Sequence, residues 1–251
     1  MKDETKSRVR YIERKLDFFG EYNDKEVNGF SDLELDDGEQ KTSAKEKEND
    51  YVIAWRRTQS SSGEPGKREL LIQSESLRKV LKEMLPDYPL SFDTKDVVID
   101  APYEVIYHNW DKIKAKADDT DSNTERDLKI LLKEVGQVQA TKRDDAQSLV
   151  ENREITFPLL WTLFPIGTKV CQRHMDDVQV SIVAPGSPGS TEKYELELWS
   201  IDYDGTQFQC LQKSVSIKSF KGTKSITDLD VFPLKYWAGA DGTRFYLLPE
   251  I

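Results

Sequence analysis

The sequence has little of the residue chemistry on which enzymes and disulfide-rich proteins depend. Its 251 residues include two cysteines and two histidines, too few for a disulfide scaffold. No stretch approaches the roughly 18 consecutive apolar residues that a membrane-spanning helix needs, and the polar first ten residues lack the apolar core of a secretory signal. We therefore expect an intracellular protein, cytoplasmic or nuclear, with no membrane partner.

Positive charge is scarce relative to negative charge. The chain has 36 Lys and Arg residues against 46 Asp and Glu residues, a formal net charge of −10. Because nucleic-acid binding depends on clustered positive charge, we expect no nucleic-acid partner. Four lysines do gather in one stretch, which we interpret as the solvated rim of a hairpin: Lys213, Lys218, Lys221 and Lys224.

Aromatic side chains are plentiful enough to build a core. They make up 10% of the chain and include five tryptophans, which we interpret as core anchors rather than a ligand-stacking platform. Residues 1–50 are predicted to be an acidic, largely disordered leader, because 20–50 shows no apolar period. Within it, residues 1–19 have apolar spacings of three and four that favour a short helix, with a strand as the alternative because VRYI is β-prone.

Residues 51–251 are predicted to form one α+β domain. A hairpin of residues 51–59 and 66–73 opens it, and a helical part follows over about 74–165. Helices are expected to begin at Ser74, which can cap the first turn, and at Pro102, which can open one. A third helix would start at a capping box formed by Thr124 with Asp127 and run to about Glu151. A short apolar helix, FPLLWTLF, follows Thr156 and stops at Pro165.

The β-rich part is predicted over about 166–251, as an antiparallel sheet or a small barrel. Short β-prone runs alternate there with turn residues, and Asp204-Gly205 favours a tight hairpin turn. In KYELELWSIDY the apolar phase slips at Trp199, which suggests a bulge or a core contact on both faces. The final run TRFYLL, within 237–251, is expected to pair with the sheet, although the role of that tail is left open.

No catalytic constellation and no cofactor site stand out in this sequence. It contains no GxxxxGK[ST] phosphate loop and no GxSxG nucleophile motif. The three residues that could ligate zinc are weak candidates: Cys171, His174 and Cys210. Residues three apart on a strand face opposite sides, so Cys171 and His174 converge only if the strand breaks. An enzyme with an unrecognised site near His108 or His174 remains the alternative hypothesis.

Several stretches of the folded part resemble a known family region. They are RELLIQSESLRKVLKEMLPDYPLSFDT, APYEVIYHNWDKI, ENREITFPLLWTLFPIGTKV, ELWSIDYDGTQF and SFKGTKSITDLDVFPLKY, in this order. Together, over about residues 51–236, they resemble the domain of unknown function that precedes the ATPase module of fungal AAA-type ATPases. The lead-in RYIERKLDFFGEY is similar to that of the family as well.

The resemblance implies no catalytic residues, because none are agreed for this region of the family. It implies an interaction or regulatory module that binds a protein partner or substrate, since N-terminal regions of such machines commonly do so. Such a module would need an exposed apolar or aromatic patch on the β-rich half, ringed by charge. The chain departs from the family pattern after Tyr236 and has no phosphate loop, so ATP is not expected to bind it. It would then be a stand-alone module or a fragment of an ATP-hydrolysing protein whose ATPase module is missing here.

Overall fold

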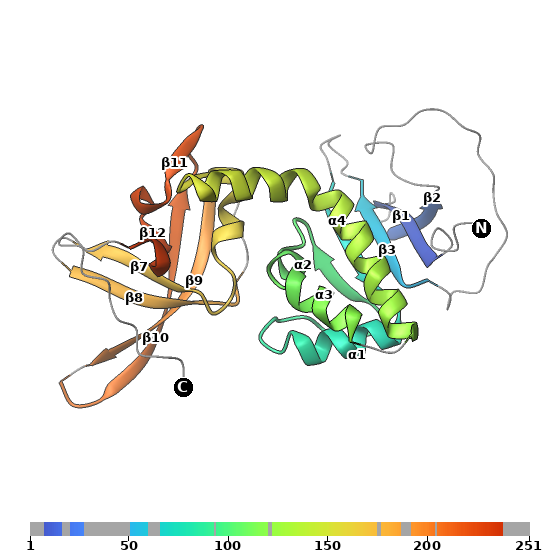
Figure 1. Cartoon of the computed structure of the whole chain (residues 1–251), viewed down its shortest axis with the longest axis horizontal. Helices are drawn as coiled ribbons and strands as arrows, with labels where there is room; N and C mark the ends of the chain where they lie inside the picture. Colours follow the sequence, from blue (N-terminus) through green and yellow to red (C-terminus); the bar gives the residue numbers. More distant parts are fainter. Residues whose placement is uncertain are drawn as a thin grey trace. The chain divides into compact units, whose positions relative to one another are not determined.

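The computed structural model divides the chain into two compact units, residues 1–139 and 140–251 (Figure 1). The residues that it describes are 8–16, 21–27, 51–59, 66–92, 94–119, 122–174, 177–186, 192–203 and 205–237. Helices and mostly antiparallel sheets occur together, so the predicted α+β class is confirmed.

The first unit is built on a five-stranded sheet. Its strands are β1 (Val9–Leu16), β2 (Tyr22–Val27), β3 (Ile53–Thr58), β4 (Arg68–Ile72) and β5 (Val97–Asp100), in the spatial order β2-β1-β3-β4-β5. Strands β1 and β3 are parallel, and every other neighbouring pair is antiparallel. Strands β3 and β4 are the hairpin that the sequence predicted.

Helices pack on one face of this sheet (Figure 1). They are α1 (Glu75–Met84), α2 (Glu104–His108), α3 (Trp110–Asp118) and the first part of α4 (Ser122–Glu151). Ser74 caps α1 as predicted, because its hydroxyl accepts a hydrogen bond from the Leu77 amide at 3.3 Å. Leu77, Leu81 and Met84 of α1 are buried against the sheet, so the apolar face read from the sequence is its core face.

The helix favoured within residues 1–19 is wrong, and the alternative, a strand, is confirmed. Residues 9–16 form β1 instead, and residues 22–27 form β2. Backbone pairing with β3 on one side and β2 on the other outweighs the weak helical spacing of so polar a segment. The rest of the predicted disordered leader, residues 28–50, lies outside the described residues.

Two predicted helices have different boundaries. The helix expected from Pro102 is split at Asn109, whose side-chain amide donates to the Val105 carbonyl at 2.8 Å and separates α2 from α3. The capping box is also wrong, because α4 begins at Ser122 and Thr124 therefore lies inside it. Helix α4 ends at Glu151 as predicted, and its last part belongs to the second unit.

The second unit is dominated by a five-stranded antiparallel sheet. Its strands are β7 (Lys169–His174), β8 (Asp177–Ala184), β9 (Lys193–Tyr203), β10 (Phe208–Lys218) and β12 (Val231–Pro233), in the order β10-β9-β8-β7-β12. Because β10 and β12 are edges, this sheet is open and the small-barrel alternative is wrong.

Short elements complete the second unit. Strands β6 (Glu154–Thr156) and β11 (Thr223–Ser225) pair with each other, and three 3₁₀ helices are present: η2 (Phe157–Leu163), η3 (Ile226–Asp228) and η4 (Leu234–Tyr236). Helix η2 is the short apolar helix expected before Pro165. Its buried residues Leu160 and Leu163 belong to the same hydrophobic cluster as Val183 and Leu198 of the sheet, so this segment helps to cover the face opposite Ile182 and Trp199.

The β9–β10 hairpin keeps one register over its whole length. Every residue from Lys193 to Tyr203 opposes one residue from Lys218 to Phe208, so the bulge expected near Trp199 is wrong. Tyr203 pairs with Phe208, which leaves four residues in the connection rather than a two-residue turn. The change in the apolar pattern at Trp199 has another cause, because β9 carries apolar residues on both of its faces. Leu196 and Leu198 lie on one face, and Trp199, Ile201 and Tyr203 lie on the other.

Candidate functional site

An exposed apolar face on the sheet of the second unit is the strongest candidate site. In an antiparallel sheet, directly opposed residues point to the same side. The register opposes Ile182 to Trp199, Ile201 to Cys210 and Tyr203 to Phe208. We call this surface the β8–β10 face, and its members are Val180, Ile182, Trp199, Ile201, Tyr203, Phe208 and Cys210.

The exposure of the β8–β10 face is large for a soluble domain. Trp199, Tyr203 and Phe208 are exposed by 48%, 54% and 77%, and Ile201 by 76%. Since an aromatic side chain carries roughly 150–250 Å², the three rings alone expose roughly 350 Å². The largest apolar patch on a typical monomer covers roughly 300–600 Å² and is often functional. The aliphatic members add to this area, so the face is of the size that marks an interaction site.

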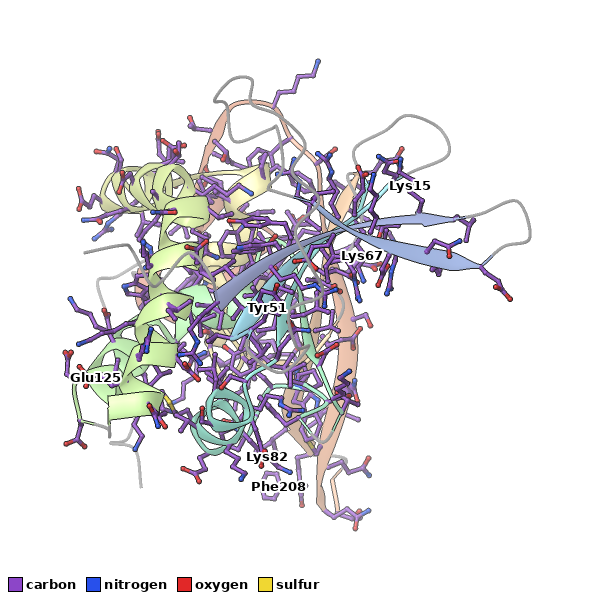
Figure 2. The ribbon with its side chains drawn as sticks, turned by 90° about the vertical axis from the view of Figure 1, so that its right-hand side faces the viewer. Lys15, Tyr51, Lys67, Lys82, Glu125 and Phe208 are labelled. Carbon is purple, nitrogen blue, oxygen red and sulfur yellow. The ribbon has the colours of Figure 1, made fainter. Side chains whose placement is uncertain are left out.

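The tip of the hairpin presents this face most openly. The Tyr203 and Phe208 rings lie side by side, with centroids 5.0 Å apart, and the Tyr203 hydroxyl donates to the Gly205 carbonyl at 2.9 Å. Figure 2 shows Phe208 at the end of the long β9–β10 ribbon. Gly205 has φ of 98°, a conformation that glycine adopts without steric cost, so the connection holds the two rings together.

Acidic residues border the β8–β10 face. Glu197 precedes Trp199 on the same side of β9 and accepts hydrogen bonds from Ser214 and, at 3.4 Å, from Gln212 on β10. Glu195, one step further, is paired with Lys193. The face thus changes from apolar to acidic along the strands, which gives it a direction that a partner could recognise by charge.

The long edge strand β10 lies next to this face. Among the strands that the structure describes, β10 has a neighbour, β9, on one side only. Its 11 residues therefore present backbone donors and acceptors along the other side, which is a template for another strand. Pro and bulges, two devices that commonly block such pairing, do not occur between Phe208 and Lys218.

At the opposite edge of the sheet, near β7 and β12, the side that carries the β8–β10 face is covered. Phe232 of β12 opposes Cys171 of β7, and Cys171 opposes Val180, so these residues share the side of the β8–β10 face. Phe232 and Cys171 are nevertheless fully buried, and the Trp237 ring stacks on Phe232 with centroids 6.2 Å apart. The exposure of the β8–β10 face is thus a local property of three strands.

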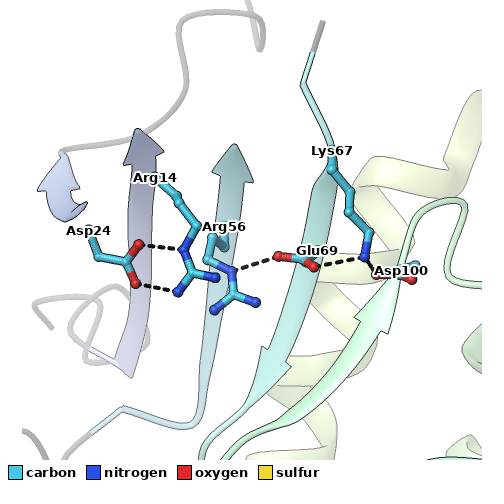
Figure 3. A network of polar contacts seen from close by, with 6 residues as sticks. All are labelled: Arg14, Asp24, Arg56, Lys67, Glu69 and Asp100. Atoms are coloured by element: carbon cyan, nitrogen blue, oxygen red, sulfur yellow. Dashed lines mark hydrogen bonds and ion pairs between the residues drawn. The ribbon is translucent and has the colours of Figure 1, made fainter. Parts of the chain in front are cut away.

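A network of ion pairs crosses the outer face of the sheet in the first unit (Figure 3). Arg14 binds both carboxylate oxygens of Asp24 at 2.6 and 2.8 Å. Beside it, Arg56 donates to Glu69 at 2.6 Å, and Lys67 bridges Glu69 and Asp100 at 3.0 and 2.9 Å. These ion pairs link neighbouring strands of the sheet, over a small apolar cluster of Ile12, Ala54 and Leu71.

Glu69 is the buried member of this network. Burial opposes ionisation of its carboxyl, but hydrogen bonds from Arg56 and Lys67 outweigh that cost and hold its pKa below the ordinary value. Asp24 likewise has a lowered pKa because of its hydrogen bonds from Arg14. All the charges of Figure 3 have partners within the network, which is the pattern of a structural brace rather than a reactive site.

The structure separates the residues proposed as zinc ligands. Cys171 is buried on β7, where its thiol contacts the Phe232 carbonyl at 3.6 Å, whereas Cys210 is exposed on β10. Three strand spacings of about 4.8 Å lie between them, while two thiolates on one zinc ion each lie about 2.3 Å from it. The side chain of His174 lies outside the described residues. Among the described residues, no three His, Cys, Asp or Glu side chains are grouped to hold a metal ion.

The other residues singled out by the sequence fall in unrelated places. His108 ends α2 with its ring edge-on to Tyr107 at 5.2 Å. Lys213 donates to Gln179 and Lys224 lies over the Phe220 ring. Among the tryptophans, Trp55 and Trp161 are buried as expected, but Trp199 is not, so its interpretation as a core anchor is wrong.

The comparisons with known proteins concern the second unit. Residues 145–238 match a family described as Domain of unknown function (DUF7025), so this part of the chain carries a domain of unknown function. No curated protein and no solved structure matches the chain. The matched range includes β8, β9 and β10, and hence the whole β8–β10 face. In the part of the chain that the structure describes, no helix is both long and apolar enough to cross a membrane.

Proposed function

We propose that the second unit is a non-catalytic protein-interaction module, and that the β8–β10 face is its binding surface. The observation that carries this proposal is the exposure of Trp199, Ile201 and Phe208 together on one side of an ordered sheet. Burying such rings against a partner removes apolar area from water, and aromatic anchors of this kind dominate binding energies at protein interfaces.

The partner is an extended protein segment that adds to the edge of β10. The edge of β10 that is unpaired among the described strands supplies backbone hydrogen bonds for strand addition, and the adjoining face supplies apolar contacts for alternate side chains. The acidic border at Glu195 and Glu197 favours a segment whose apolar residues are followed by Lys or Arg. A strand of this kind uses both the edge and the face, whereas a globular surface would use the face alone.

The wider context proposed for this module is that of fungal AAA-type ATPases. Its support is the resemblance of residues 51–236 to the region before their ATPase module, together with the match to a domain of unknown function. In that setting the module would recruit a protein substrate or adaptor in the cytoplasm or nucleus, and the chain itself would neither bind nor hydrolyse ATP.

Site-specific photo-crosslinking tests the binding surface directly. A photo-crosslinking phenylalanine derivative is placed at Ile201, on the β8–β10 face, or at Asp202, the adjacent residue of β9 on the opposite side. Cells that produce each variant are irradiated, and the crosslinked peptides are identified by mass spectrometry. We expect a protein that crosslinks through one extended segment from position 201 and not from position 202.

Two results would contradict the proposal. Equal crosslinking from positions 201 and 202 would show that the face has no special role. Crosslinks from position 201 that scatter over many unrelated proteins, with no recurring segment, would show non-specific adhesion of an apolar surface. The purified partner identified by a specific crosslink then serves for affinity measurements.

A further inference from the structure

A polar cavity of about 530 Å³ lies in the first unit, apart from the proposed binding surface. Its volume is within the roughly 300–1,000 Å³ of small-molecule sites. The wall combines the N-terminus of α1 with residues that precede β1 and β5 and with the start of α4. Three basic and three acidic side chains line it, namely Arg8, Arg78 and Lys95 with Glu75, Asp96 and Asp127.

Asp127 organises one side of this cavity. Its side chain is only 4% exposed and forms an ion pair with Arg8 at 3.0 Å. Its other carboxylate oxygen accepts hydrogen bonds from the hydroxyls of Ser74 and Ser76 at 2.5 and 3.0 Å. A buried carboxylate is thus fixed against the first turn of α1, and its position is set before any ligand arrives.

Two buried polar atoms without hydrogen-bond partners belong to residues that line the cavity. Among the described residues these atoms are Gln73 Oε1 and Arg78 Nε, both on residues that line it, whereas both oxygens of Asp127 are engaged by Arg8, Ser74 and Ser76. The amide nitrogen of Gln73 already donates to Asp96 at 3.4 Å, so its free atom is the acceptor. Leaving such groups unsatisfied costs roughly 1–3 kcal/mol each, so each calls for a partner.

These atoms define the chemistry of a complementary ligand. Gln73 Oε1 requires a hydrogen-bond donor, and the carboxylate of Asp127, which also lines the cavity, favours one that carries positive charge. Arg78 Nε requires an acceptor, and the first-turn amides of α1 beside it favour a negative one. The equal numbers of acidic and basic residues disfavour a ligand with large net charge, such as a phosphate ester.

We propose that this cavity binds a small zwitterion, a free α-amino acid. Its ammonium group is held by Asp127 and Gln73, and its carboxylate by Arg78 and the N-terminus of α1. The side chain of the amino acid occupies the remaining volume beside Tyr51, Lys95 and Asn123, which also line the cavity.

Calorimetric titration of the full chain with each of the common L-amino acids tests the proposal. We expect saturable binding of at least one of them. Its affinity should fall by about tenfold or more when its amino group is acetylated or its carboxyl group is amidated. In Arg78→Gln and Gln73→Met the affinity should fall by about tenfold or more. The matched control Lys82→Gln, on α1 but outside the cavity, should bind like the unmodified chain. Circular dichroism verifies that each variant is folded. If one of the two cavity variants does not fold, the other still tests the proposal.

Three outcomes would overturn the proposal. They are the absence of saturable binding up to about 10 mM of every amino acid, equal binding of the acetylated or amidated derivative, and stronger binding of inorganic phosphate or of glucose. Unchanged affinity in both cavity variants would place an observed site elsewhere. None of these results bears on the β8–β10 face, which is tested separately.

Discussion

Replacement of Glu104 by glutamine should make the protein more stable at neutral and alkaline pH. Glu104 begins α2, and its Oε1 atom is buried and has no hydrogen-bond partner among the described residues. Burial raises the pKa of this carboxyl from 4.5 to about 7, because the ionised form loses its hydration. The folded state therefore favours the protonated form.

The sign and size of the effect follow from linkage. A carboxyl whose pKa is raised on folding contributes stability that is complete below about pH 4.5 and is lost as the pH rises to about 7. Each unit of pKa difference corresponds to about 1.36 kcal/mol, so the difference between 4.5 and about 7 amounts to roughly 3 kcal/mol. Glu104→Gln removes this titration and keeps the shape of the side chain.

Urea unfolding followed by circular dichroism between about pH 4 and pH 8 measures the effect. We expect Glu104→Gln and the unmodified chain to have similar free energies of unfolding near pH 4, and the variant to be more stable by up to roughly 3 kcal/mol near pH 8. Glu83→Gln, at an exposed position of α1, is the matched control and should show no such trend. A stability difference for Glu104→Gln that does not change with pH would refute the reasoning.

Three further predictions concern other parts of the fold. Glu69→Gln should show the opposite trend, because a lowered pKa contributes stability above about pH 4.5 that is lost as the pH falls; the deficit at neutral pH should be about 2 kcal/mol in the same assay and should shrink in acid. Gly136→Ala should lower the melting temperature despite the helix propensity of alanine, because the added Cβ would lie 2.9 Å from the Trp110 ring and overpacking costs about 1–3 kcal/mol. Leu198→Ala should cost about 2–5 kcal/mol in urea unfolding, whereas Ile201→Ala, on the exposed side of the same strand, should change stability by less than about 0.5 kcal/mol; equal costs would mean that the two faces of β9 are misassigned.

Local signals predicted much of the fold because they have local causes. Ser74 caps α1 through its own hydroxyl, and Pro165 follows the end of η2. The strands of the second unit were likewise visible as short β-prone runs between turn residues. The class and most element positions therefore followed from capping, proline geometry and β propensity.

Non-local pairing explains what the sequence left open or did not predict. Strand β1 exists because β3, some forty residues later, offers a parallel partner, as shown by the opposition of Val9 and Ile53. Strand β5 was missed as well, since its four residues Val97–Asp100 gain their place from pairing with β4. Such pairs depend on which segments meet in three dimensions, and a single sequence carries little trace of that.

The two candidate sites differ in how visible they were. The slip of apolar phase at Trp199 was a true signal of the β8–β10 face, but its cause is an exposed second face rather than a bulge. The cavity of the first unit left no comparable signal, because Arg8, the 73–78 segment and Asp127 are far apart in the chain. Only the folded chain brings these residues together.

The affinity of the crosslinked partner for surface variants tests the central claim most directly. Ile201→Asp places a charge on the β8–β10 face, and Val138→Asp places the same charge on α4 in the first unit, where Val138 is 37% exposed. Loss of an apolar anchor at an interface centre costs about 2 kcal/mol or more, which is about thirtyfold in affinity. We predict that Ile201→Asp weakens binding by at least that factor while Val138→Asp binds like the unmodified chain. Equal affinities of the two variants would contradict the account.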